Sequence, residues 1–281
     1  MTPDPVPTIR QLLAFYLEAG VDCALMDEPV NRLADAEASV REPAEPAVKR
    51  RTLASMEPDT PPKPPARVEI SPDAAMAAAR DAARAALSLE ALRGAMDIFE
   101  GCALKTTATR LVFADGNPQA RIMVVGEVPG RDEDIEGQPF VGPAGKLLDR
   151  MLAAIGLDRT TVYLANLIPW PPPGNRPPTP QETLTCLPFI QRQIELVNPD
   201  ILVTLGNAPT QALLQTKDGI MKSRGRWVDY DTGTRKIRAV ASYHPDYLIR
   251  QPSYKRMAWQ DLRSISTALA ALPPQEPPPS S

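Results

Sequence analysis

The chain has 281 residues, 43% of them apolar, and its 31 Lys and Arg nearly balance 34 Asp and Glu, for a formal net charge of -3. This composition can build a sizeable core, but no apolar run approaches the ~20 residues of a membrane span, and no secretory signal peptide opens the chain. One histidine and three scattered cysteines exclude a disulfide scaffold and a zinc site built from those residues alone. We therefore expect a cytoplasmic protein.

The first 70 residues are expected to lie outside the main domain. Residues 8–20 predict an amphipathic helix, because Thr8 and Gln11 form a capping box ahead of apolar residues at helical spacing. Residues 1–33 are therefore assigned to a short tethered helix, which either docks on a protein partner or folds back on its own domain. Residues 34–70 and 271–281 are rich in proline, which predicts a disordered linker and a disordered tail.

Residues 71–270 are predicted to form the main domain, which opens with an alanine-rich helical stretch over residues 71–99. Apolar runs then alternate with helical periods, a pattern typical of a mainly parallel sheet flanked by helices. The predicted strands are residues 121–126, 162–166, 200–206 and 237–242. The predicted helices are residues 143–155, a helix that opens at Thr179, and residues 208–215 and 253–269. The expected fold class is α/β with a four-stranded, mainly parallel sheet.

Positive charge is concentrated near the end of this domain. Residues 221–260 contain nine Lys and Arg against three Asp, a local charge of about +6. In a nearly neutral protein this concentration is typical of a protein that binds polyanions, although an ordinary solvated surface would give the same count.

Functional side chains follow the predicted strands at their carboxyl ends, where open parallel sheets bind ligands. Gly126 and Glu127 end the first strand and precede Phe140, Asn166 ends the second strand, and His244 follows the fourth. Four of these residues also have an ordinary structural explanation. Glu127 could be an acid at a helix entry and Phe140 a core residue. Asn166 could stabilise a turn, and His244 could be a capped loop histidine. Together they predict one site that holds a carboxylate, a ring, an amide and the only imidazole of the chain.

Three motifs within residues 98–270 resemble those of the type-4 uracil-DNA glycosylases, a family of the uracil-DNA glycosylase superfamily. They are GEVPGRDEDIEGQPFVGPAGKLLDRML from Gly126, NLIPWPPPGNRPPTPQE from Asn166 and YHPDYLIR from Tyr243. The resemblance implies the α/β fold of that superfamily. It also implies a DNA-repair enzyme that flips uracil out of DNA and hydrolyses its N-glycosidic bond, leaving an abasic site.

The resemblance implies roles for the residues at the strand ends. Phe140, which is assigned to substrate binding together with Gly126, would stack on the flipped base. Asn166 would pair with O4 and N3–H of uracil. His244 would donate a hydrogen bond to O2 of the departing base, and Glu127 would polarise the attacking water.

The same resemblance assigns five residues to DNA binding: Arg176, Leu248, Arg250, Lys255 and Arg256. Leu248 would fill the gap that the flipped base leaves in the stack, as apolar wedges do elsewhere. The basic residues lie where phosphate contacts are expected. Asp246 departs from the family pattern, which usually has a serine at this position, and an anion beside the DNA path is unexpected.

Members of this family commonly hold a [4Fe–4S] cluster with four cysteines. Here Cys102 and Cys186 match two of the ligand positions, whereas Lys105 and Trp170 occupy the other two. Because two thiolates cannot hold a cluster that normally takes four, we expect no metal and no cofactor. Lys105 and Trp170 would then fill the space by packing.

The leading hypothesis is a monomeric uracil-DNA glycosylase whose partner is uracil-containing DNA and which does not associate with membranes. A second hypothesis is a non-catalytic module that binds uracil or DNA and recruits a replication or repair partner through the N-terminal helix. A third is an α/β hydrolase that acts on a small nucleoside, and the basic region argues against it.

Overall fold

A computed structural model describes residues 71–273 of the chain. The predicted N-terminal helix, the predicted linker and most of the predicted tail lie outside the described residues. Within residues 71–273, no helix is long and apolar enough to cross a membrane.

The described residues form one mixed sheet of six strands with helices on both faces. The strands are β1 (Asp115–Gly116), β2 (Ile122–Gly126), β3 (Val162–Asn166), β4 (Ile201–Leu205), β5 (Trp227–Asp231) and β6 (Lys236–Ser242). They lie in the order β1-β3-β2-β4-β6-β5. The inner four run parallel, and the edge strands β1 and β5 pair antiparallel with β3 and β6.

The α/β class and the parallel strands are confirmed, but the predicted number of four strands is wrong. The four inner strands are those expected from sequence, because three of them are buried at every position and β6 over most of its length. Burial on both faces gives the continuous apolar runs from which they were predicted. The two edge strands lack that signal: β1 has two residues, and β5 exposes Val228, Asp229 and Asp231.

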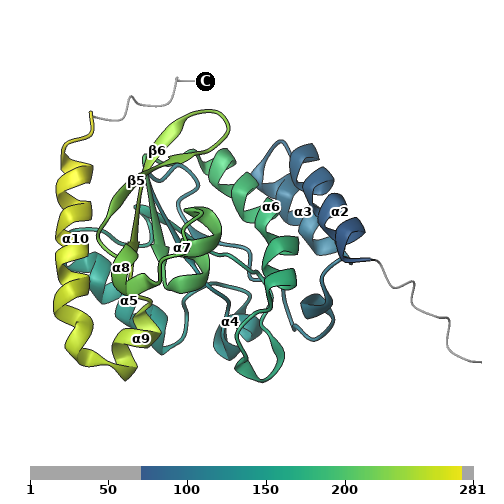
Figure 1. Cartoon of the computed structure of the whole chain (residues 1–281), viewed down its shortest axis with the longest axis horizontal. Coiled ribbons are helices and arrows are strands. Elements are labelled where there is room, and N and C mark those ends of the chain that lie inside the picture. Colours follow the sequence, from purple (N-terminus) through teal and green to yellow (C-terminus); the bar gives the residue numbers. More distant parts are fainter. Residues whose placement is uncertain (1–70, 274–281) are drawn as a thin grey trace, which may run out of the picture. The chain divides into compact units, whose positions relative to one another are not determined.

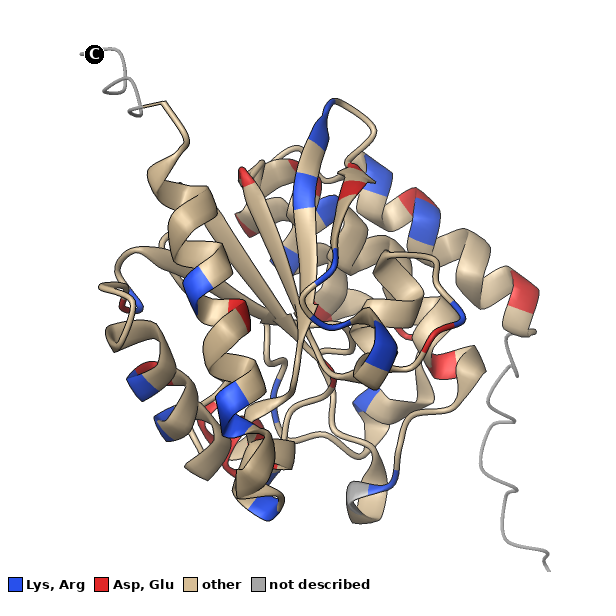
Figure 2. Ribbon diagram, turned by 60° about the vertical axis from the view of Figure 1, so that its left-hand side comes forward, with Lys and Arg blue, Asp and Glu red and all other residues tan. Residues whose placement is uncertain are grey.

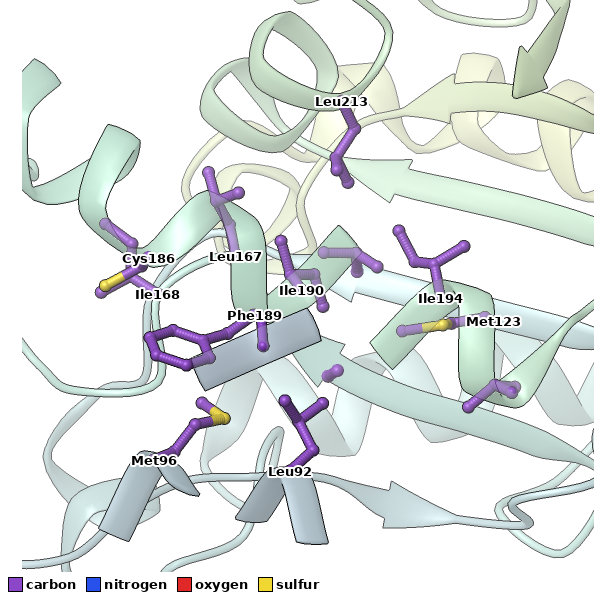
Figure 3. Packing of buried hydrophobic residues seen from close by; sticks show 14 of the residues in the cluster. Leu92, Met96, Met123, Leu167, Ile168, Cys186, Phe189, Ile190, Ile194 and Leu213 are labelled. Atoms are coloured by element: carbon purple, nitrogen blue, oxygen red, sulfur yellow. The ribbon is translucent and has the colours of Figure 1, made fainter. Parts of the chain in front are cut away.

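One face of the sheet is covered by α2 (Pro72–Ala85), α3 (Leu89–Ile98) and α6 (Pro180–Val197), which lie to the right of the strands in Figure 1. Met123 of β2 packs there with Leu92, Phe189 and Ile194 in the larger core cluster, part of which is drawn in Figure 3. The helical stretch predicted for residues 71–99 consists of two helices. The first ends at Ala85, and the side chain of Ser88 accepts a hydrogen bond from the backbone N–H of Ala91 and so starts the second.

The other face is covered by α5 (Pro143–Ala153) and α10 (Lys255–Ala270). Ile122 and Val124 of β2 point to this side and pack with Leu148, Leu152 and Ile265. Alternate residues of one strand therefore belong to two different cores, as the period of two in a β-strand requires. A further helix, α7 (Asn207–Leu213), follows β4 in the chain.

Three short helices occupy the carboxyl-end side of the parallel strands: α4 (Arg131–Glu136), α8 (Ile220–Ser223) and α9 (Pro245–Arg250). Figure 1 shows α4 and α9 near the lower edge of the sheet. Single 3-10 turns lie at Ala103–Thr106, Pro173–Asn175 and Pro252–Tyr254. The loops that join β2 to α4 and β6 to α9 therefore meet at one edge, which is where the sequence predicts a site.

Candidate active site

The predicted catalytic and substrate-binding residues line one cavity. It has a volume of about 760 Å³, and its walls include Glu127, Phe140, Asn166 and His244. β2 and β3 are neighbours, with Gly126 at the end of β2 in register with Asn166 at the end of β3, and β4 separates β2 from β6, the strand that precedes His244. A cavity of this size lies in the range usual for small-molecule and cofactor sites.

Two glycines allow these side chains to approach one another. A Cβ placed on Gly126 would lie 2.5 Å from Cζ of Phe140 and 2.6 Å from Oδ1 of Asn166, so the ring and the amide both lie directly against this backbone. A Cβ on Gly206, which follows β4 with a φ of 96°, would lie 3.5 Å from Cβ of His244 and 3.6 Å from Oε2 of Glu127. A side chain at Gly126 would therefore collide with the ring and the amide, whereas at Gly206 it is the positive φ that favours glycine.

His244 is a neutral donor in this environment. His244 is the N-cap of α9, and its Nδ1 accepts a hydrogen bond of 3.2 Å from the backbone N–H of Asp246 in the first turn of that helix. A nitrogen that accepts carries no proton, so the neutral ring carries its proton on Nε2. Burial lowers the pKa of His244 to about 4 and outweighs the opposing effect of Asp246, which raises it. The imidazole is therefore uncharged near pH 7.

The strand that leads to His244, β6, is anchored by a buried carboxylate on α10. Asp261 is 1% exposed and accepts hydrogen bonds from Oγ of Ser242, at 2.8 Å, and from Nε of Arg224, at 3.0 Å. Ser242 is the last residue of β6, two positions before His244. Because a buried carboxylate is stable only when it is paired, this network fixes the end of the strand firmly.

Glu127 and Asn166 have side chains without partners among residues 71–273, and both line the cavity. Asn166 is 6% exposed. A nearly buried carboxamide that forms no hydrogen bond with the protein can form its hydrogen bonds with a ligand. Burial raises the pKa of Glu127 above its usual 4.5, which makes this carboxylate a stronger base than a solvated one.

Phe140 forms an aromatic wall of the cavity. Its ring centroid lies 6.0 Å from that of His244, and the two planes are inclined by 29°. The residue is 4% exposed and has a φ of 57°, in the left-handed region. For a residue with a Cβ this conformation costs roughly 1–2 kcal/mol, so the surrounding structure must hold it.

Other residues of the cavity wall were not predicted from sequence. Tyr243 and Tyr247 flank His244 in the YHPDY segment, line the cavity and stack on each other with centroids 5.5 Å apart. Asn207 lines it as well, and its Oδ1 accepts a hydrogen bond of 2.6 Å from the backbone N–H of Ile220 at the start of α8. Tyr247 belongs to the YHPDYLIR motif, and this position in the sequence indicates that it lies near the site. No sequence pattern indicates the contact between Asn207 and Ile220.

The residues assigned to DNA phosphates lie in different environments. Lys255 and Arg256 are exposed at the start of α10. Arg250 lines the cavity, but its guanidinium is 2.7 Å from the carboxylate of Asp246. Arg176 donates two hydrogen bonds, of 2.9 and 2.6 Å, to Glu182. Arg176 therefore stabilises the capping box of α6, a structural role that the sequence interpretation did not include.

Leu248 lies inside the protein instead of at its surface. It is 1% exposed and packs with Tyr243 and Ala258. Ile249, the next residue of α9, is the exposed apolar side chain of that helix, at 42%. In this conformation Leu248 cannot reach a base stack, so the predicted wedge role requires that α9 move.

The predicted cluster region does not fit an iron–sulfur cluster. Cys102 and Cys186 are both buried with their Sγ atoms 3.8 Å apart, and each interacts with the other. The Lys105 ammonium instead binds the backbone oxygens of Met96, Asp97 and Phe99 at the end of α3. Trp170 is 1% exposed in the same core. Among the described residues, no group of three or more His, Cys, Asp or Glu could hold a metal ion.

Much of the positive charge in residues 221–260 is already paired. Arg224, Arg226, Arg235 and Arg250 each form an ion pair with an aspartate. Figure 2 shows basic and acidic residues interspersed over the ribbon of the described part. A local excess of positive charge in the sequence therefore does not translate directly into a continuous basic face.

The described residues form an α/β protein with a cavity at the carboxyl ends of the parallel strands of its sheet. Residues 113–263 match the family described as the Uracil DNA glycosylase superfamily, and the chain belongs to this superfamily. It is 39% identical over 168 residues to the Type-4 uracil-DNA glycosylase of Archaeoglobus fulgidus, a match that covers 58% of this chain and 84% of the relative.

Two further relatives carry the same name. The Type-4 uracil-DNA glycosylase of Saccharolobus solfataricus is 39% identical over 177 residues, which cover 61% of this chain and 82% of the relative. That of Thermotoga maritima is 40% identical over 169 residues, which cover 59% of this chain and 86% of the relative. The resemblance seen in the three sequence motifs is thereby confirmed.

Proposed function

We propose that this protein is a uracil-DNA glycosylase that removes uracil from DNA and leaves an abasic site. The observation that carries the proposal is the meeting of an unpaired carboxamide, a neutral imidazole and a half-buried carboxylate around one cavity beside an aromatic ring. Relatives named Type-4 uracil-DNA glycosylase, each matched over more than four fifths of its length, support the same activity.

Base recognition is assigned to Phe140 and Asn166. A uracil inside the cavity has been turned out of the helix, at a cost of a few kcal/mol that stacking and hydrogen bonds in the site must offset. Phe140 supplies the stacking surface. The carboxamide of Asn166 donates to O4 and accepts from N3–H, and a fitted bidentate pair of this kind discriminates by roughly 1–3 kcal/mol against the wrong base.

The leaving group is stabilised by His244. When the bond between C1′ and N1 breaks, its electron pair goes to the base and negative charge spreads to O2. The Nε2–H of the neutral imidazole donates to that oxygen. Because the charge exists mainly in the transition state, this hydrogen bond accelerates the reaction more than it tightens binding.

Glu127 completes the hydrolysis on the sugar. Its carboxylate accepts a proton from the water that forms the new bond to C1′, and its negative charge opposes the positive charge that develops on the sugar. The pKa of Glu127, raised by burial, lies closer to neutral pH than that of a solvated carboxyl, which favours general-base catalysis. Glu127 then gives up this proton to solvent and the uracil anion takes up one at N1, so the products are free uracil and an abasic sugar.

The glycosylase is proposed to work without an iron–sulfur cluster. The family cofactor normally takes four thiolates, whereas this chain offers Cys102 and Cys186 and places the Lys105 ammonium on backbone carbonyls. All of the chemical steps above are assigned to side chains of the cavity, so none depends on a metal.

Release of free uracil from a uracil-containing oligonucleotide tests this function. The wild-type protein should release it, whereas His244→Ala should lose about 100- to 1000-fold in kcat, as expected for one lost oxyanion donor. Asn166→Ala should lose activity through weaker recognition of the base. If wild type and both variants release equally little uracil while remaining folded, the enzyme assignment is wrong.

A further inference from the structure

The positive φ of Phe140 must be stabilised by contacts with other parts of the protein. Only three residues other than glycine have a positive φ among residues 71–273, and Phe140 is the one that lines the cavity. Relaxation of φ to a negative value would redirect the ring away from its present position. The contacts that hold this backbone therefore also fix the position of the Phe140 ring in the cavity wall.

The carbonyl group of Phe140 is confined from one side by α5. A Cβ on Gly145, in the first turn of that helix, would overlap the carbonyl oxygen of Phe140. Gly145 is buried, and only a residue without a side chain leaves room for the oxygen there. This close contact explains where the carbonyl lies, but packing alone supplies no donor for it.

Arg159 supplies the donor. Its Nη2 donates to the carbonyl oxygen of Phe140, and its Nη1 lies 3.3 Å from the carbonyl oxygen of Pro139. The guanidinium is itself fixed by two carboxylates: Nε is 2.8 Å from Asp149 on α5, and Nη1 is 2.6 Å from Asp115 on β1. One planar group thus connects two secondary-structure elements to the loop that carries the ring.

We propose that Arg159 is a positioning residue for the glycosylase reaction: by holding the strained backbone of Phe140 it keeps the base-stacking ring against the cavity. The role rests on the proposed function. Arg159 does not line the cavity and acts only through Phe140. A displacement of about 1 Å in a positioning group can cost about 100-fold in rate, so the loss of Arg159 should be large for a residue outside the site.

A double-mutant cycle separates positioning from general stability. Arg159→Met should lower kcat/KM for uracil release by about 30- to 100-fold. In a Phe140→Ala background the same substitution should cost less than about threefold, because there is no ring left to position. Equal losses in both backgrounds would overturn the proposal.

Arg121→Met is the matched control, since Arg121 forms a 2.7 Å ion pair with Asp200 and its side chain is about as exposed as that of Arg159. It should change kcat/KM by less than about threefold. If Arg121→Met lowered kcat/KM as much as Arg159→Met does, the loss of any partly buried ion pair would have this effect, and the proposal would be overturned.

Crystal structures give a readout that does not depend on activity. In Arg159→Met, the φ of Phe140 should leave the left-handed region, and a φ still near 57° would overturn the proposal. A wild-type protein that releases no uracil would instead refute the proposed function alone. If Arg159→Met does not fold, Asp115→Asn takes its place, because it removes one of the two carboxylates that fix the guanidinium.

Discussion

The backbone N–H of Asp246 donates to Nδ1 of His244 over 3.2 Å, which leaves Nε2 as the nitrogen that carries the proton of the neutral ring. The same residue directs its carboxylate to Arg250, 2.7 Å away. Asp246 therefore sets the tautomer of the imidazole through its backbone and neutralises a cation beside the cavity through its side chain.

The pH dependence of activity should follow Glu127, not His244. Burial raises the pKa of Glu127 above 4.5, so kcat/KM should fall as the pH drops through this raised value and the carboxylate becomes protonated. Burial holds the pKa of His244 at about 4, so the ring stays neutral over that range. The measurement is kcat/KM from pH 4 to 9 for the wild type and for Glu127→Gln.

The residual activity of Glu127→Gln should be independent of pH down to about pH 4, where His244 becomes protonated. A limb centred near pH 6.5 that persists in this variant would mean that His244 titrates as a solvated imidazole does. Such a result would contradict the burial and tautomer assigned to the ring.

Asp246→Ser should tighten DNA binding. The carboxylate competes with phosphate for Arg250, and both side chains are more than half exposed, so the gain should be modest, about two- to fivefold in Kd at low salt. Fluorescence anisotropy with a uracil-containing oligonucleotide would measure it. Asp229→Asn on β5, which removes one negative charge away from the cavity, is the control and should leave Kd nearly unchanged.

Lys105→Met should destabilise the fold without removing a metal ligand. The ammonium group binds three backbone oxygens at the carboxyl end of α3, a favourable place for a cation. Its loss should lower the free energy of unfolding by about 1–2 kcal/mol, measured by urea denaturation. Lys222→Met, at an exposed position of α8, should change it by less than about 0.5 kcal/mol. Equal effects would mean that Lys105 is an ordinary surface lysine.

Purified protein should contain no stoichiometric iron and should show no broad absorbance near 400 nm. The reason is the ligand set, since Lys105 and Trp170 occupy two of the four positions and cannot act as cluster thiolates. Elemental analysis of protein purified without exposure to oxygen gives the answer. About four irons per chain would contradict the assignment.

The sequence predicts the parts of the fold that burial controls. The inner strands β2, β3, β4 and β6 begin and end within one residue of the predicted ranges, because burial on both faces leaves long apolar runs. The edge strands β1 and β5 escape detection, since one is too short and the other is mostly exposed. The break between α2 and α3 is marked in the sequence only by the N-cap Ser88, a single serine in an alanine-rich stretch.

The candidate site follows the same logic. Glu127, Asn166 and His244 could be placed together because the carboxyl ends of parallel strands share one edge. The burial of Leu248 could not be predicted, since it depends on packing against Ala258 on another helix. The clamp formed by Arg159 depends on Asp115, 44 residues away in sequence, and no local pattern marks such a contact.

The most direct test of the central claim is the crystal structure of the protein with free uracil bound. We expect the base to lie against the ring of Phe140, with O2 within hydrogen-bonding distance of Nε2 of His244 and with O4 and N3 facing the carboxamide of Asn166. Uracil bound outside this cavity, or inside it with O2 directed away from His244, would contradict the account.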